Sequence, residues 1–238
     1  MLFSIVATQS SDSLFQLGNT YYENEQYETA ARTYEQLEND YSHEYLYLNL
    51  GNSYYRMGEL GNAVWSYEKA YSIAPRDQDI IYNLNFVRSQ VRDRIIPPDN
   101  FFIFSLYTAF LDKTTILDIS VLGGLLFLII SITYLMNSYL LIPEKLNSII
   151  NSTLIFTLVF LIWVSVDKYW KFTDINEAIV ISTSVDVRSA PIQRGENVVF
   201  RVHEGTKAQI TAVESGWYEI ILLDGKKGWL STQDMRKL

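Results

Sequence analysis

The chain has 238 residues, a mean hydropathy of +0.03 and a formal net charge of −8. Residues 1–100 carry fourteen acidic and seven basic side chains, which excludes a nucleic-acid partner because nothing there could neutralise phosphates. The chain has no cysteine, and its two histidines, His43 and His203, are far apart in sequence. This composition excludes disulfides, thiolate catalysis and cysteine-ligated zinc, so we expect no metal site and no cofactor.

Residues 1–10 resemble the end of a secretory signal peptide. A short apolar run is followed by small residues, but the basic leading segment of a signal peptide is missing. Two interpretations stay open, a signal-peptide remnant and a frayed N-terminal end.

Residues 11–96 contain one pattern twice. Residues 14–21 read Leu-Phe-Gln-Leu-Gly-Asn-Thr-Tyr, and residues 47–54 read Tyr-Leu-Asn-Leu-Gly-Asn-Ser-Tyr. The pattern resembles the tetratricopeptide repeat, whose period is about 34 residues. The resemblance implies two helix pairs, and the apolar spacing over residues 79–95 predicts a third helix that caps the last repeat.

Small and aromatic residues recur at matching places in the two copies. We expect Gly18 and Gly51 to let the two helices of each repeat approach closely. Ala30 and Ala63 should do the same from the second helix, because a larger side chain would overpack the contact. Tyrosines fill the space between the helices, and Pro75 ends the second copy.

Repeats of this kind bind peptides along a concave face lined by the first helix of each pair. Asparagine side chains can donate to and accept from an extended peptide backbone, which makes them suitable for this face. The residues expected on it are Asn19, Tyr22, Glu23, Asn49, Asn52, Tyr55, Arg56 and Asn83. Lysines that clamp a peptide carboxylate in some family members are missing here. An alternative is that the asparagines only form hydrogen bonds between helices.

Residues 97–115 form an aromatic segment. Pro97 and Pro98 end the capping helix, and the apolar run from Phe101 to Leu111 is too short to cross a bilayer. We predict a helix lying at the membrane interface, or a surface on which the soluble part docks to the bilayer.

Residues 116–137 and 149–167 are two predicted transmembrane helices, joined by a short loop over residues 138–148. Crossing the hydrocarbon takes about 20 apolar residues, and Asp118 is the only charge within the first stretch. A buried helix pair of a soluble protein is the alternative. A membrane hairpin would leave the chain before residue 100 and the chain after residue 170 on the same face.

Residues 177–238 change to short alternating runs with turn signals, which predicts a small all-β barrel. The runs Val185 to Pro191, Glu204 to Thr206, Gly216 to Tyr218 and Gly228 to Leu230 resemble the hallmarks of bacterial SH3-like domains. Trp217, Tyr218 and Trp229 are candidate ligand contacts, although both tryptophans could equally belong to the core.

The complete order is multidomain: an all-α repeat pair with a capping helix, an aromatic segment, two transmembrane helices and an SH3-like barrel. This order resembles the BatE family of the Bacteroides aerotolerance cluster. The resemblance implies partners with von Willebrand A domains, other Bat-type proteins and, indirectly, a MoxR-type ATPase. It also implies the bacterial inner membrane, with both soluble domains in the periplasm.

The charges that flank the spans favour the opposite orientation. Lys113, Lys168 and Lys171 lie on the outer flanks and Lys145 alone lies in the hairpin, which by the positive-inside rule places both domains in the cytosol. We follow the resemblance, because bacterial SH3-like domains are mostly extracytoplasmic.

Motifs of catalysis are missing from the sequence, including a nucleophile elbow, a phosphate-binding loop and His-Glu-x-x-His. We therefore expect no enzyme but a membrane-anchored scaffold that binds protein partners through its repeats, linked to aerotolerance or envelope stress. The alternative is a membrane-tethered sensor that binds cell-wall peptides through the SH3-like domain.

Overall fold

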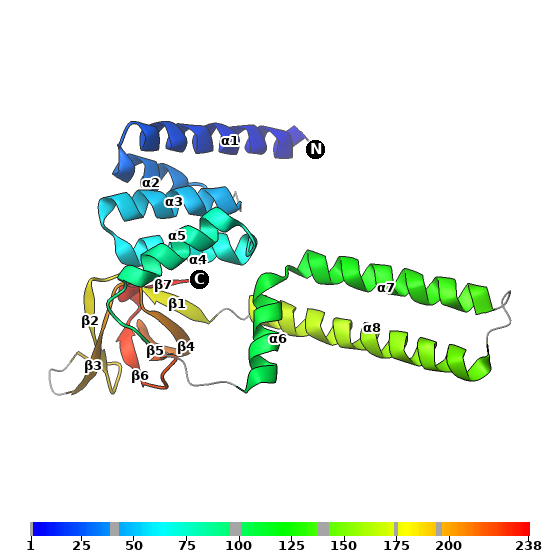
Figure 1. The fold of residues 1–238 in the computed structure, drawn as a ribbon. Helices are drawn as coiled ribbons and strands as arrows, with labels where there is room; N and C mark the ends of the chain where they lie inside the picture. Colours follow the sequence, from blue (N-terminus) through cyan, green and yellow to red (C-terminus); the bar gives the residue numbers. More distant parts are fainter. Residues whose placement is uncertain (1, 39–42, 96–100, 138–142, 174–175, 194–196) are drawn as a thin grey trace. The chain divides into compact units, whose positions relative to one another are not determined.

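The computed structural model describes residues 2–38, 43–95, 101–137, 143–173, 176–193 and 197–238. The chain forms two compact units, one made of Met1–Asn100 together with Asn176–Leu238 and the other of Phe101–Ile175 (Figure 1). The first unit contains the predicted repeats and the predicted C-terminal domain. The second unit contains the aromatic segment and both predicted spans.

Five helices of the first unit pack in chain order, each against the next (Figure 1). They are α1 (Leu2–Glu23), α2 (Tyr27–Glu35), α3 (Glu44–Met57), α4 (Leu60–Ile73) and α5 (Gln78–Gln90). Residues 2–10, for which a signal-peptide remnant and a frayed end were the two interpretations, belong to α1. Local signals set the ends of the later helices: Gly58 ends α3 in the left-handed conformation (φ 81°), and the Asp77 carboxylate accepts from two backbone N–H groups at the start of α5.

Close glycine–tyrosine contacts hold each helix pair together. A Cβ atom on Gly18 would lie 2.5 Å from the Tyr34 ring, and one on Gly51 would lie 2.7 Å from the Tyr67 ring. Both distances are far inside van der Waals contact, so only glycine fits opposite these rings. The two contacts occupy equivalent places in the two repeats, as the sequence pattern predicted.

The sheet of the first unit has seven antiparallel strands in the order β3-β2-β6-β5-β4-β1-β7. They are β1 (Glu177–Val180), β2 (Ser184–Arg188), β3 (Val198–His203), β4 (Lys207–Glu214), β5 (Trp217–Ile221), β6 (Lys227–Ser231) and β7 (Met235–Lys237). The predicted barrel is wrong, because β3 and β7 do not pair and the described strands do not close. Alternation of apolar residues predicts strands and hairpins, but it does not specify whether the outer strands meet.

Strand β1 joins the sheet to the repeats, because both of its faces are buried. Ala178 and Val180 belong to the apolar core of the sheet, whereas Ile179 belongs to the core of the repeats. Gly61 of α4 makes this approach possible, since a Cβ atom there would lie 2.6 Å from the Val180 carbonyl oxygen.

We call the contact region between the repeat helices and the sheet the joint. Strand β7 contributes polar contacts to it. The Arg236 guanidinium lies 3.6 Å from the centroid of the Trp65 ring and donates to Glu38 at 2.5 Å and to the Tyr54 hydroxyl at 3.2 Å. The indole N–H of Trp65 donates to the Lys237 carbonyl oxygen at 2.6 Å. A planar cation stacked on an indole and paired with a carboxylate combines cation–π attraction with charge-assisted hydrogen bonding.

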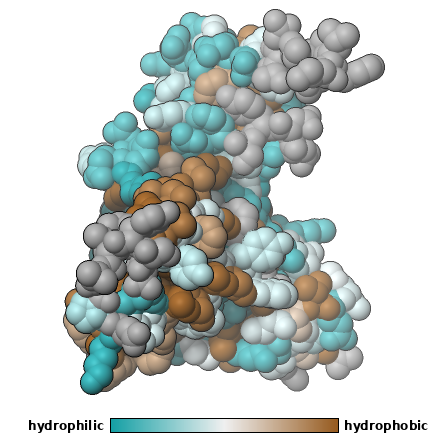
Figure 2. Space-filling model, turned by 90° about the vertical axis from the view of Figure 1, so that its right-hand side faces the viewer, coloured by the Kyte–Doolittle hydropathy of each residue, from teal (hydrophilic) through white to brown (hydrophobic). Residues whose placement is uncertain are grey.

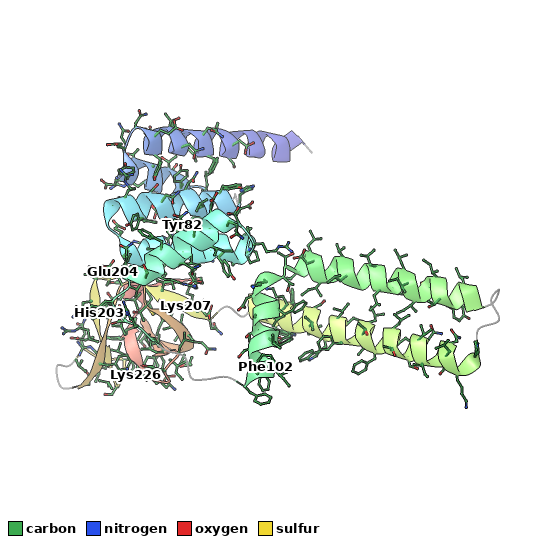
Figure 3. All side chains as sticks on the ribbon, in the orientation of Figure 1. Tyr82, Phe102, His203, Glu204, Lys207 and Lys226 are labelled. Carbon is green, nitrogen blue, oxygen red and sulfur yellow. The ribbon has the colours of Figure 1, made fainter. Side chains whose placement is uncertain are left out.

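The segment after α5 forms the third part of the joint and explains why the capping helix stops before residue 95. Val91 is extended (ψ 133°), and the Asp93 carboxylate then accepts from the His203 backbone N–H at 2.6 Å and from the Thr206 hydroxyl at 2.8 Å. Figure 3 shows His203 on the side of the sheet that faces the helices. Ile95 packs against the core of the sheet. Leaving the helix is therefore what lets this segment contact the sheet.

Charge pairing continues beside Asp93. The buried Glu68 carboxylate bonds to Arg88 at 2.5 Å and lies 3.5 Å from the Lys207 ammonium. Burial by itself lowers the pKa of Lys207, but the negative charges of Glu68 and Glu177 outweigh burial and raise that pKa above its ordinary value. A buried carboxylate is tolerated here because both domains supply a cation to it.

The second unit consists of α6 (Phe102–Lys113), α7 (Ile116–Asn137) and α8 (Glu144–Thr173). Helix α7 covers the first predicted span. Helix α8 extends beyond the predicted second span at both ends, and residues 144–148, predicted as loop, are helical. Hydropathy identifies only the apolar part of a helix, so the polar ends of α8 were not predicted. The helix begins directly after Pro143, at a position where proline is tolerated.

Two segments of this unit, Ile116–Leu135 and Lys145–Trp170, are long and apolar enough to cross a membrane. Only 6% of each apolar window is buried, whereas a helix pair in a soluble core would be mostly buried. On the face shown in Figure 2, hydrophobic residues lie mainly in the middle, with hydrophilic residues around them.

We predict that Gly51→Ala destabilises the first unit by about 1–3 kcal/mol, because the added methyl group overlaps the Tyr67 ring. Urea unfolding of the full chain in detergent measures the loss. In a Tyr67→Val background, which lacks the ring, the same change should be neutral or slightly stabilising, since alanine is the better helix former. An equal loss in both backgrounds would exclude the contact as its cause.

We also predict that Asp93 makes the first unit sensitive to acid. Burial raises the pKa of Asp93, but hydrogen bonds from His203 and Thr206 outweigh burial and hold that pKa below its ordinary value. The stabilisation is therefore complete above about pH 4 and is lost as the pH falls through the lowered pKa. Asp93→Asn should lower the free energy of unfolding at pH 7 by about 1–3 kcal/mol, and this difference should shrink between pH 4 and 2. Asp12→Asn, on an exposed part of α1, is the matched control and should leave stability unchanged.

Candidate functional site

A pocket of about 200 Å³ opens on the repeat helices. It gathers residues of α1, α3, α4 and α5, and five of the predicted concave-face residues line it. Its lining consists of Tyr22, Asn52, Tyr55, Arg56, Tyr67, Tyr82, Asn83, Phe86 and Val87. We call this site the repeat pocket.

The aromatic wall of the repeat pocket is built mainly by α5. Tyr82 and Phe86 stack with their ring planes 7° apart, and Phe86 meets Tyr55 edge to face with centroids 5.7 Å apart. Tyr82 is 69% exposed, and Figure 3 labels it on α5. The sequence analysis did not predict Tyr82 and Phe86 as site residues, because α5 was interpreted only as the capping helix and not as part of the binding face. Their spacing of one helical turn beside Asn83 was the available signal.

Arg56 supplies the positive charge of the repeat pocket. Its guanidinium lies 4.6 Å above the Tyr27 ring, which in turn meets Tyr22 edge to face. Burial raises the pKa of Tyr22, and the nearby Arg56 offsets part of that rise. Arg56 is exposed, and no ion pair of the described residues includes it. A cation without a carboxylate partner is therefore available to a ligand in an otherwise acidic region.

The predicted asparagines are partly engaged within the fold. Asn19 Oδ1 accepts from the Tyr34 hydroxyl at 2.7 Å and from Asn49 Nδ2 at 2.9 Å. Asn52 repeats the first contact, with its Oδ1 accepting from the Tyr67 hydroxyl at 2.8 Å.

The other asparagines differ in what they leave for a ligand. Asn83 Nδ2 donates to the Asp79 carbonyl oxygen, which leaves its side-chain oxygen facing the pocket lining. Asn19 and Asn49 do not line the repeat pocket, and their bonds to each other agree with the alternative that they connect helices. Asn52 connects α3 to α4 and also lines the pocket, whereas Asn83 bonds within α5 and lines the pocket.

A second cavity, of about 450 Å³, adjoins the repeat pocket and shares Tyr55 and Arg56 with it. It continues past Leu60 and Gln90 to Glu204, which comes from the turn between β3 and β4. Gln90 donates to the Tyr55 hydroxyl at 3.3 Å. Together the two cavities form a groove that runs from the repeats to the sheet.

The Glu204-Gly-Thr206 turn belongs to the joint as well as to the groove. Glu204 accepts from the Gly61 backbone N–H at 3.2 Å, and a Cβ atom on Gly205 (φ 83°) would lie 2.6 Å from Val91. The sequence marked this turn only as an SH3-like hallmark. Its contacts with the helices were not predictable, because they join residues more than 100 positions apart.

The aromatic residues of the sheet lie on two different faces. Trp217 and Trp229 point to the same face, since Trp229 pairs with Glu219, two residues beyond Trp217 on β5. Both tryptophans are half-buried, and the apolar core cluster of the described strands does not include them. Tyr218 points to the opposite face and packs against the core of the sheet.

The comparisons with known families agree with the helical architecture. Residues 12–43 and residues 45–77 each match a tetratricopeptide repeat family profile. The predicted pair of repeats is therefore confirmed, and such repeats mediate protein–protein interaction. No match was found among curated proteins.

We predict that Asn52 and Tyr82 differ in what they do for stability. Asn52→Ala should lower the free energy of unfolding by about 1–3 kcal/mol, because it leaves the buried Tyr67 hydroxyl without a partner. Tyr82→Ala, at an exposed position, should change it by less than about 0.5 kcal/mol. Chemical unfolding of both variants checks the difference, and equal losses would contradict the assigned bond.

Proposed function

We propose that the protein is a non-catalytic, membrane-anchored scaffold that binds a protein partner in the repeat pocket. The observation that carries the proposal is the meeting of exposed aromatic rings with Arg56 in a groove of tetratricopeptide repeats. Exposed aromatic and arginine side chains around a concave site are the residue types that dominate binding energy at protein interfaces.

The groove fits an extended peptide segment with one apolar or aromatic side chain and a nearby acidic group. The apolar side chain would enter between Tyr55, Tyr82 and Phe86, and the acid would pair with Arg56. Asn52 Nδ2 and Asn83 Oδ1 would bond to the peptide backbone. A single arginine in place of a lysine clamp favours recognition through several modest contacts together.

The membrane part of the proposal rests on the exposed apolar surfaces of α7 and α8. The joint between the repeats and the sheet supports the hairpin. Because the chain on either side of α7 and α8 folds into one unit, it has to return to the face of the membrane from which it departed. Two spans satisfy that condition, whereas one span would separate the halves of the joint.

The identity of the partners follows from the resemblance of the domain order to the BatE family. We propose membrane proteins with von Willebrand A domains and other Bat-type proteins as direct partners, and a MoxR-type ATPase as an indirect one. The same resemblance favours the bacterial inner membrane, a periplasmic position for both soluble parts, and a role in aerotolerance or envelope stress.

The half-buried tryptophans of the sheet favour a second candidate function. Trp217 and Trp229 share one face with Glu219 and Arg188, which would suit a short peptide of the cell wall. In that case the sheet would be the recognition module of a membrane-tethered sensor, and the repeats would be a spacer.

We predict that Arg56→Ala combined with Tyr82→Ala weakens association with A-domain partners at least tenfold, which is about 1.4 kcal/mol. Quantitative co-purification of the full chain in mild detergent, followed by titration of the purified pair, measures the affinity. The matched control is Arg32→Ala with Tyr45→Ala, which removes the same residue types from exposed positions outside the groove.

A third variant distinguishes the two candidate functions. Trp217→Ala with Trp229→Ala should leave the association intact if the repeats bind the partner. If this variant abolishes binding while the groove variant does not, the sheet is the recognition module and our proposal is wrong. Deleting residues 177–238 would not distinguish the two functions, because the deletion also removes the strands that contact the repeat helices.

A further inference from the structure

Helix α6 lies across the ends of α7 and α8 instead of continuing either of them (Figure 1). Its apolar side chains are open to their surroundings: Phe102 is 70% exposed, Ile103 63% and Leu106 56%. Figure 3 labels Phe102 at the start of this helix. An uncovered stretch of this kind in water would be unfavourable, so it points to an apolar partner.

The helical spacing sorts the residues of α6 onto opposite sides. Ser105, Thr108 and Asp112 recur at three- and four-residue intervals and form a polar stripe. Four exposed apolar residues, Phe102, Ile103, Leu106 and Phe110, occupy the other side, whereas the exposed Phe104 lies one turn before Thr108, beside the polar stripe. This pattern is typical of a helix that lies in the plane of a membrane surface.

Specific contacts fix α6 to one end of α8. The Tyr107 hydroxyl donates to the Asp167 carboxylate at 2.6 Å, and the Tyr107 ring stacks on Trp163. The Lys168 ammonium donates to the Leu111 carbonyl oxygen at 2.5 Å, near the C-terminal end of α6. Residue Leu111 is buried in a small cluster with Ile119 and Val164.

A capping box separates α6 from the first span. The Asp118 carboxylate accepts from the Thr115 backbone N–H at 2.8 Å, and the Thr115 hydroxyl accepts from the Asp118 backbone N–H at 3.2 Å. These reciprocal bonds start α7 at a defined residue, so the chain turns between the two helices. The single charge within the first predicted span, Asp118, therefore defines where α7 begins.

We propose that α6 is an in-plane anchor whose side containing Phe102, Leu106 and Phe110 inserts between lipid headgroups and acyl chains. This inference rests on the proposed membrane hairpin. Three observations favour lipid over a protein partner. The same unit contains the uncovered apolar surfaces of α7 and α8, and the one charged residue on the apolar side of α6, Lys113, stands at the end of the helix, where a long side chain can reach the headgroups. The ties to Asp167 and Lys168 hold α6 near the end of the apolar part of α8.

The test uses the absence of cysteine from the natural sequence. Single variants Leu106→Cys, Thr108→Cys and Leu128→Cys of the full chain are spin-labelled and reconstituted in phosphatidylcholine bilayers. Collisions with oxygen, which concentrates in hydrocarbon, and with a nickel chelate, which stays in water, report the surroundings of each label. We expect the label at Leu106 to meet the chelate several-fold less often than the label at Thr108, and oxygen several-fold more often.

The label at Leu128, in the middle of α7, separates failure of the anchor from failure of the hairpin. If the label at Leu128 lies in hydrocarbon while the label at Leu106 meets the chelate as often as the label at Thr108, α6 is not an anchor, but the proposal that α7 crosses the bilayer is supported. If the label at Leu106 meets neither reagent, protein covers this side and the proposal is wrong. If Leu128 itself meets the chelate freely, the hairpin does not cross the bilayer, and the anchor fails with it.

Discussion

The stacking of Arg236 on Trp65 is the interaction on which the first unit depends. It joins the last strand of the chain to a helix of the second repeat, and Glu38 and Tyr54 hold the guanidinium in place. Arg236 lies on β7, and β7 pairs with β1, the strand that packs against the repeats. The contacts of Arg236 therefore hold both strands against the repeat helices. The groove that reaches Glu204 exists only while this joint is formed.

The repeats show which parts of a site can be predicted from spacing. Gly18 and Gly51 were correctly placed against the paired helix, because a period of 33 residues puts equivalent side chains in equivalent positions. Of the predicted asparagines, Asn52 and Asn83 line the repeat pocket and Asn19 and Asn49 do not, because spacing does not determine which atoms form hydrogen bonds. The hydrogen bonds depend on tyrosines in the second helix of each repeat, whose hydroxyl groups donate to the side-chain oxygens of Asn19 and Asn52.

The sheet and the two apolar helices show where prediction from the sequence ends. Alternation located the strands but could not show that the sheet stays open, because pairing of outer strands is a long-range property. Hydropathy located both apolar helices but predicted too short a length for α8, since this helix continues through polar residues. The aromatic wall formed by Tyr82 and Phe86 needed the actual position of α5 beside α3.

The joint also imposes an order on how the protein is made. Its bonds connect residues 110 to 198 positions apart, and α6, α7 and α8 are synthesised between them. The repeats therefore leave the ribosome with Trp65 and Glu68 uncovered, and these residues stay without their partners on the sheet until α6, α7, α8 and the strands have been synthesised. Loop closure over such distances is slow compared with formation of the local helix pairs. The final three-residue strand, β7, thus completes a fold that begins at the opposite end of the chain.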